Sequence, residues 1–182
     1  MVSVRMMRAR SLVPTSVING ILFNITWLCI VVSESAVFAP LFALLHLTIH
    51  FTVVGARRYE IKLVALVTGL GFLLDQLLFK TGVFTVAGAA SSAPLWMTSL
   101  WPVLATTVLH AFSFLQGRLW LAVVFGAVGG ALSYTAGTSL TAVEFFDPSL
   151  GPLVLGLVWA LVFPLLLALG AYFARRVNSP EG

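Results

Sequence analysis

Asp75 is an acidic side chain inside a long apolar segment of this chain. The apolar run over residues 61–79 is long enough to cross a bilayer as a helix, and the acid lies in its second half. A carboxylate near a membrane centre costs about 2.5–3.5 kcal/mol, which the many Leu, Ile, Val and Phe residues of the run offset. On a helix Asp75 shares one face with Thr68, Gly71 and Gly82, so we expect this face to point away from lipid.

Two interpretations of this acid remain open. Asp75 either lines a polar pocket that opens outward, where it could bind a cation or shuttle a proton, or it is held by hydroxyl and indole donors purely to fix the bundle. Lys80 is five residues away, which is poor geometry for an ion pair, and its side chain is expected to reach the outer interface. Helical rise places several other polar or aromatic residues at the depth of Asp75. The candidate binding residues are Asp75, Gln76, Ser99, Trp101, Tyr134 and Thr135.

A second polar cluster is expected near the inner end of the bundle. His46 and His50 are one turn apart on one helix, and His110 and Asn19 are predicted at a similar depth. Three histidines match the ligand count of a zinc site with an open position. No Cys, Asp or Glu is expected at that depth and the chain has no HExxH pattern, so we predict hydrogen bonding between helices and no metal.

Motifs that would identify an enzyme are missing from the sequence. There is no nucleophile motif, phosphate-binding loop or paired-carboxylate spacing, and Asp75 and His110 are expected at opposite depths. The sequence therefore predicts no catalytic residue and no cofactor, and it does not favour an enzyme.

The composition identifies the class of protein. Of the 182 residues, 60% are hydrophobic and only 9% are charged, with a mean hydropathy of +1.06, which is typical of an integral membrane protein. The formal net charge of +4 does not indicate nucleic-acid binding, because the basic residues flank apolar runs. The lone Cys29 excludes an intramolecular disulfide. We expect one membrane domain over residues 1–182, with membrane lipids as partners.

The apolar runs predict an all-α bundle of six transmembrane helices. The first run is longer than a signal-peptide core and is expected to remain as the first helix. Pro102 should kink the fourth helix, and residues 81–93 are expected to form a loop at the interface. The predicted helices cover about residues 13–33, 36–54, 61–80, 94–115, 119–137 and 150–174.

The distribution of basic residues predicts the orientation. With six helices, nine of the ten Lys and Arg residues fall on the side of both termini and only Lys80 falls on the other. Because positive charge favours the cytoplasmic side, both termini are expected in the cytoplasm.

Three glycines mark a close helix contact. Gly126 and Gly130 form a GxxxG pair, and Gly129 lies beside them on the fifth predicted helix. A neighbouring helix of the same chain is the favoured occupant of this groove. The alternative is a second copy or another membrane protein.

Three stretches resemble a known family. They are GLGFLLDQLL, APLWMTSLWPVLATTVLHAF and GGALSYTAGTSL, and Asn19 and Trp27 match as well. Together they resemble the bacterial inner-membrane domain-of-unknown-function family numbered twenty-eight seventy-eight, over nearly the whole chain. The resemblance implies a multi-pass protein of the bacterial inner membrane. Its members are often encoded beside lipid-modifying genes, which implies a link to membrane lipids and supplies no established activity.

Three functions remain open from the sequence. The favoured one is binding or transport of a small apolar or lipid-derived molecule in an outer-half pocket around Asp75. The alternatives are a membrane enzyme of lipid modification and a non-catalytic structural subunit of a membrane complex.

Overall fold

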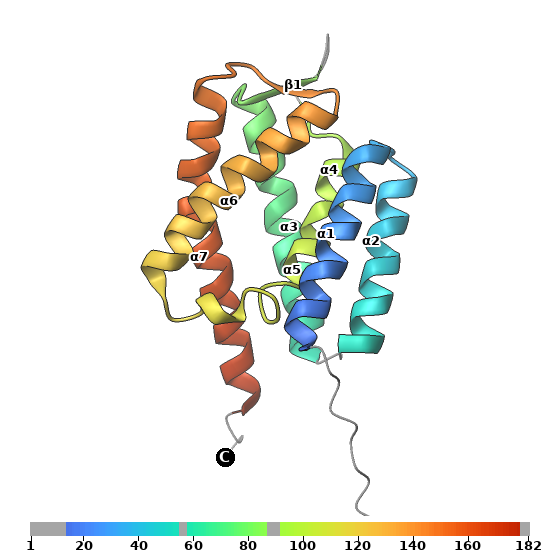
Figure 1. The fold of residues 1–182 in the computed structure, drawn as a ribbon, viewed down its shortest axis with the longest axis vertical. Helices are drawn as coiled ribbons and strands as arrows, with labels where there is room; N and C mark the ends of the chain where they lie inside the picture. Colours follow the sequence, from blue (N-terminus) through green and yellow to red (C-terminus); the bar gives the residue numbers. More distant parts are fainter. Residues whose placement is uncertain (1–13, 55–57, 87–91, 179–182) are drawn as a thin grey trace, which may run out of the picture.

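The computed structural model describes residues 14–54, 58–86 and 92–178, which form a helical bundle (Figure 1). A two-stranded sheet lies at one end of the bundle and is made of β1 (Phe84–Val86) and β2 (Val143–Phe145). The helices are α1 (Thr15–Ser33), α2 (Phe38–Ile49), the π-helix η1 (His50–Val54), α3 (Arg58–Lys80), α4 (Leu95–Thr98), α5 (Leu100–Ala105), the 3-10 helix η2 (Ser113–Leu115), α6 (Leu119–Leu140) and α7 (Leu150–Asn178).

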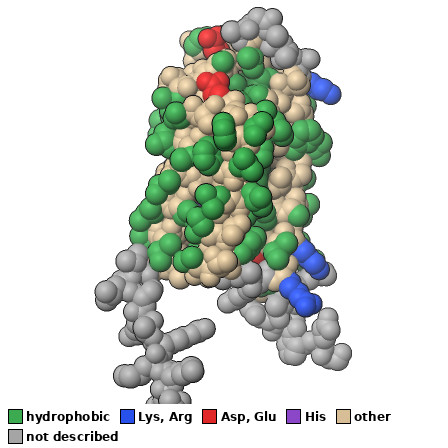
Figure 2. All heavy atoms as spheres, turned by 90° about the vertical axis from the view of Figure 1, so that its right-hand side faces the viewer, with side chains coloured by type: hydrophobic (Ala, Val, Ile, Leu, Met, Phe, Trp, Pro, Cys, Tyr) green, Lys and Arg blue, Asp and Glu red, His purple; other side chains and the backbone are tan. Residues whose placement is uncertain are grey.

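Among the residues that the structure describes, four helices are long and apolar enough to cross a membrane. They are α1, α3, α6 and α7, whereas Phe38–Val54 and Leu95–Ala105 are shorter apolar helices. Hydrophobic side chains cover the face of the molecule seen in Figure 2, and the visible charged side chains lie toward its two ends. Many large apolar side chains are exposed on α1, α6 and α7, as expected for helices that face lipid. The fold is therefore that of a membrane protein.

The bundle is arranged around α3. The α1–α2 pair lies on one side, the α6–α7 pair lies on the other, and α4 and α5 lie between them (Figure 1). We call the end that carries β1 and β2 the hairpin end, and the end where α1 begins and α7 finishes the terminal end. Because α3 runs from the terminal end to the hairpin end, its first turn and its second half contribute to different sites.

The predicted fourth helix is wrong as a continuous element. Residues 94–115 form the short helices α4 and α5, a series of turns, and then η2. Pro102 has no N–H to donate to the carbonyl of Thr98, which breaks the ladder between α4 and α5. After α5 the hydroxyls of Thr106 and Thr107 donate to the carbonyls of Val103 and Leu104 at 2.8 and 2.6 Å, and the chain continues in turns.

Two short paired strands lie at the hairpin end, in segments where the sequence predicted no regular structure. Phe84 pairs with Phe145, Thr85 with Glu144 and Val86 with Val143, in antiparallel register. Gly82 has a positive φ of 75° and ends α3, so it caps the helix and does not extend the face of Asp75. The remaining helices begin and end within a few residues of their predicted bounds, and α6 and α7 run past their predicted ends to Leu140 and Asn178.

Candidate functional site

Asp75 binds the indole of Trp101 inside the bundle. Asp75 is 0% exposed, and Trp101 Nε1 donates to its Oδ2 atom at 2.8 Å. One turn earlier on α3, Gly71 faces the same ring so closely that a Cβ there would overlap the indole. The small residue and the acceptor on α3 therefore hold Trp101 in one place.

Trp101 forms part of the wall of a cavity near the hairpin end. The cavity has a volume of about 170 Å³ and is enclosed mainly by apolar and aromatic side chains. The ring of Trp101 stacks on Trp159 of α7 with centroids 5.6 Å apart, and Tyr134 of α6 lies 6.1 Å from Trp159. Phe84 of β1 stacks on Tyr134 at 5.5 Å. These contacts build a continuous aromatic wall from α5 to the hairpin.

The cavity reaches the surface beside α6. Phe125, Gly129 and Ser133 line the cavity and are also exposed, with Phe125 exposed to 45%. Phe23 and Trp27 of α1 line the opposite side. In Figure 1, α6 slants away from α1 toward the terminal end, and the two helices touch only slightly. The opening therefore lies between α1 and α6, on the side of the bundle.

Only two of the six candidate binding residues line this cavity. They are Trp101 and Tyr134. Asp75 lies outside the lining because the indole that it binds forms the wall. Gln76 Oε1 accepts a hydrogen bond from the Ala93 backbone at 3.3 Å, and the hydroxyls of Ser99 and Thr135 donate to carbonyls of their own helical turns. The cavity is therefore mainly apolar, and its polar lining consists of a few hydroxyl groups and not of the Asp75 carboxylate that the sequence predicted there.

The glycines of α6 serve two different purposes. A Cβ at Gly126 or Gly130 would overlap Trp159 of α7, so these two residues let α6 and α7 pack closely. Gly129 lines the cavity, and the nearest atom to a Cβ there is Phe125 Cδ1 at 3.9 Å. The favoured occupant of the GxxxG groove, a helix of the same chain, is the one that the structure places there.

The second polar cluster is a connected network nearer the terminal end. Asn19 Nδ2 donates to His50 Nδ1 at 3.2 Å and to Thr106 Oγ1 at 3.4 Å, while its Oδ1 accepts from the Ala111 backbone at 3.2 Å. His46 Nε2 lies 2.9 Å from Thr106 Oγ1. Since the Thr106 hydroxyl donates to a carbonyl, its oxygen accepts from both neighbours. Thr106, which the sequence did not single out, thus joins His46 to Asn19, and Asn19 in turn contacts His50.

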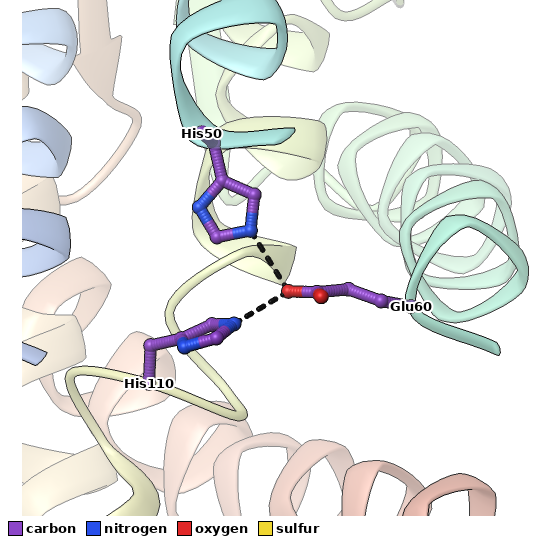
Figure 3. Close-up of side chains that lie close together, drawn as sticks. All are labelled: His50, Glu60 and His110. Atoms are coloured by element: carbon purple, nitrogen blue, oxygen red, sulfur yellow. Dashed lines mark hydrogen bonds and ion pairs between the residues drawn. The ribbon is translucent and has the colours of Figure 1, made fainter. Parts of the chain in front are cut away.

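Glu60 completes this network and was missed. His50 Nε2 lies 2.8 Å and His110 Nε2 lies 2.6 Å from the same oxygen, Glu60 Oε1 (Figure 3). The prediction that no acid lies at this depth is wrong, because α3 begins at Arg58 and carries Glu60 in its first turn. The short connection between η1 and α3 was the available signal, since it must bring His50 and Glu60 to the same end of the bundle.

These elements define a helical membrane protein with an aromatic cavity at one end and a buried His–Glu–His cluster toward the other. The family described as "protein of unknown function (DUF2878)" matches residues 16–165 of this chain. The chain belongs to that family. Comparisons with the curated proteins and with the solved structures found no match.

Proposed function

We propose that this protein binds a small apolar or lipid-derived amphiphile in the aromatic cavity and exchanges it with the membrane. The observation that carries the proposal is an apolar cavity that reaches the surface between two membrane-facing helices. Transport across the bilayer would build on such binding.

The size of the cavity limits the ligand. An apolar cavity of about 150 Å³ holds a benzene-sized molecule, so about 170 Å³ accommodates one ring or a short stretch of acyl chain. The rest of a longer ligand would extend through the opening between α1 and α6 into lipid. Aromatic walls offer large apolar contact area to such a ligand.

Hydroxyl groups near the hairpin end favour an amphiphile. Ser133, Tyr134, Thr138 and Thr141 line the cavity on the side of the hairpin. The Thr138 and Thr141 hydroxyls donate to helix carbonyls, and Thr141 Oγ1 also accepts from the Val143 N–H at 3.3 Å. Each oxygen keeps a lone pair that can accept from a polar headgroup. A few polar groups in an apolar site are what orient a ligand.

Intrinsic fluorescence tests this binding directly. Four of the five tryptophans line the cavity, and the fifth, Trp120, is 80% exposed. In a Trp120→Phe background, a brominated fatty acid in detergent should quench the remaining tryptophans saturably, with one ligand per chain. Gly129→Leu should fill the cavity and weaken that quenching roughly tenfold or more, since a misfitted apolar group costs about 1–3 kcal/mol.

Gly69→Leu is the matched control, because Gly69 lies on α3 outside the cavity lining, and a Cβ at this position would meet no atom within 4 Å. It should quench as the parent does. Equal quenching of the parent and folded Gly129→Leu would contradict the proposal.

The proposed topology has six spans, with both termini in the cytoplasm of a bacterial inner membrane. The shorter segments Phe38–Val54 and Leu95–Ala105 would complete the crossing beside the four long helices. Alkaline phosphatase fused at Ser139 should be active and fused at Gly117 inactive. The reverse pattern would invert the orientation.

A further inference from the structure

We propose that His50, Glu60 and His110 form a binding site for one divalent transition-metal ion, with Zn²⁺ as the best match. Glu60, which was not predicted to lie near the histidines, supplies a carboxylate as the third ligand beside the two imidazoles (Figure 3). Two histidines and one glutamate are a known three-ligand set for zinc, and they leave a coordination position open.

The geometry of the ligand atoms carries the proposal. One nitrogen or oxygen of each residue lies within 4.8 Å of the other two. Both Nε2 atoms point at the same carboxylate oxygen, at 2.8 and 2.6 Å. The three residues come from η1, the first turn of α3 and the turns after α5, so the fold gathers separate segments around one point. A π-helix such as η1 often marks a functional site.

The buried carboxylate of Glu60 favours the binding of a cation. Glu60 is 2% exposed, and within the part of the chain that the structure describes its ion-pair partners are these two histidines. A buried carboxylate is costly unless a positive charge balances it. A divalent ion held by Glu60 and two neutral imidazoles supplies that charge.

An ion can reach the cluster past His110. The side chain of His110 is 20% exposed, whereas that of His50 is fully buried. The cluster therefore has one ligand at the surface and two in the interior, which gives a path for entry from the terminal end.

The residue behind His50 determines how tightly the ion is held. A histidine that binds metal through Nε2 carries a proton on Nδ1 and donates it to an acceptor. Asn19 presents its Nδ2 to His50 Nδ1, because its Oδ1 accepts from the Ala111 backbone. Metal binding thus requires the amide to turn over, which would break its bonds to the Ala111 N–H and to Thr106 Oγ1. Asn19→Asp would present an oxygen to His50 Nδ1 and to the Ala111 N–H without that turn, and would lose only the bond to Thr106 Oγ1.

The test uses the full-length protein purified in detergent with a histidine-free affinity tag. After treatment with a chelator, the protein is titrated with Zn²⁺ alone against a chromogenic competitor. One Zn²⁺ should bind per chain and raise the unfolding temperature. Glu60→Gln and His110→Gln should each weaken binding more than the roughly 10–100-fold that is lost when a residue that only orients a ligand is removed.

Two further variants separate this site from metal binding elsewhere on the chain. Cys29→Ser removes an exposed thiol that is outside the ligand set, and it should keep the parent affinity. Asn19→Asp should tighten binding on the order of tenfold, in the manner of a carboxylate–histidine–metal arrangement.

X-ray absorption on the zinc-loaded parent needs no variant. It should show two imidazoles and oxygen, with no sulfur from the exposed Cys29. The proposal is overturned if the folded parent binds no zinc, if folded Glu60→Gln and His110→Gln bind it as the parent does, or if the spectrum shows sulfur. The outcome is separate from that of the cavity, because none of the three proposed ligands lines it.

Discussion

Gly71 lies against the indole of Trp101 so closely that no larger residue fits without displacing the ring. Gly71→Ala should therefore destabilise the protein by about 1–3 kcal/mol, the usual cost of overpacking. Gly69→Ala is the matched change on the same helix, where a Cβ meets nothing within 4 Å. It should be neutral or stabilising by up to about 1 kcal/mol. Thermal unfolding in detergent checks both, and equal unfolding temperatures would contradict the packing.

The hydrogen bond from Trp101 to Asp75 should appear as a coupling energy. Trp101→Phe leaves the buried carboxylate without its donor and should cost about 1–3 kcal/mol or more. Asp75→Asn keeps the size and an acceptor oxygen and should cost less. In the Asp75→Leu background the polar part of the Trp101→Phe cost should vanish, as measured by a double-mutant cycle of unfolding free energies. Additive effects would show that the two side chains do not interact.

The packing of α6 against α7 should be disrupted by a substitution at Gly130 and unaffected by one at Gly137. Gly130→Ala places a Cβ into Trp159 and should destabilise the protein by about 1–3 kcal/mol. Gly137→Ala lies further along α6, where a Cβ meets nothing within 4 Å, and should have little effect. If Gly130→Ala alters only an oligomer while the monomer keeps its stability, self-association rather than α7 explains the glycine. Light scattering beside thermal unfolding separates these results.

Asp147, just before α7, should make the stability of the protein depend on pH. Its Oδ1 accepts from the backbone N–H groups of Leu150 and Ser149 at 3.0 and 2.8 Å, and these donors hold the pKa of its carboxyl below the usual value. The stabilising effect is therefore present above the ordinary pKa and lost as pH falls through the lowered one. Asp147→Ala should unfold at a lower temperature than the parent at pH 7, and the difference should disappear in acid.

Asp147→Asn retains a capping oxygen that does not titrate, so its unfolding temperature should lack this acid-dependent loss. A difference between the parent and Asp147→Ala that persists unchanged into acid would exclude the carboxylate as its source.

The long helices could be predicted because apolar runs of membrane length leave few alternatives. The break in residues 94–115 could not be predicted. It depends on the missing N–H of Pro102 and on the Thr106 and Thr107 hydroxyls, which donate to backbone carbonyls of the preceding turn. The strands were also out of reach. Each has three residues, and their partners lie far apart in the chain, so no local pattern indicates the pairing.

The sequence could predict many residues of the candidate sites, but it could not predict which side chains they would contact. Depth along helices gathered Asn19, His46, His50 and His110, because rise per residue is fixed. Glu60 was missed because a shift of a few residues at the start of α3 moves an acid from a loop into a helix. Asp75 was expected to line a pocket, but its hydrogen bond with the indole N–H of Trp101 depends on tertiary packing that no spacing encodes.

β1 follows the last turn of α3 and β2 follows the last turn of α6, so their pairing joins those two helix ends. Phe84 and Val143 belong to the same pair of strands and also close the hairpin end of the cavity. Under the proposed function, a ligand should therefore enter and leave sideways, through the opening between α1 and α6. Its rate of exchange should then follow the composition of the surrounding lipid rather than that of the aqueous phase.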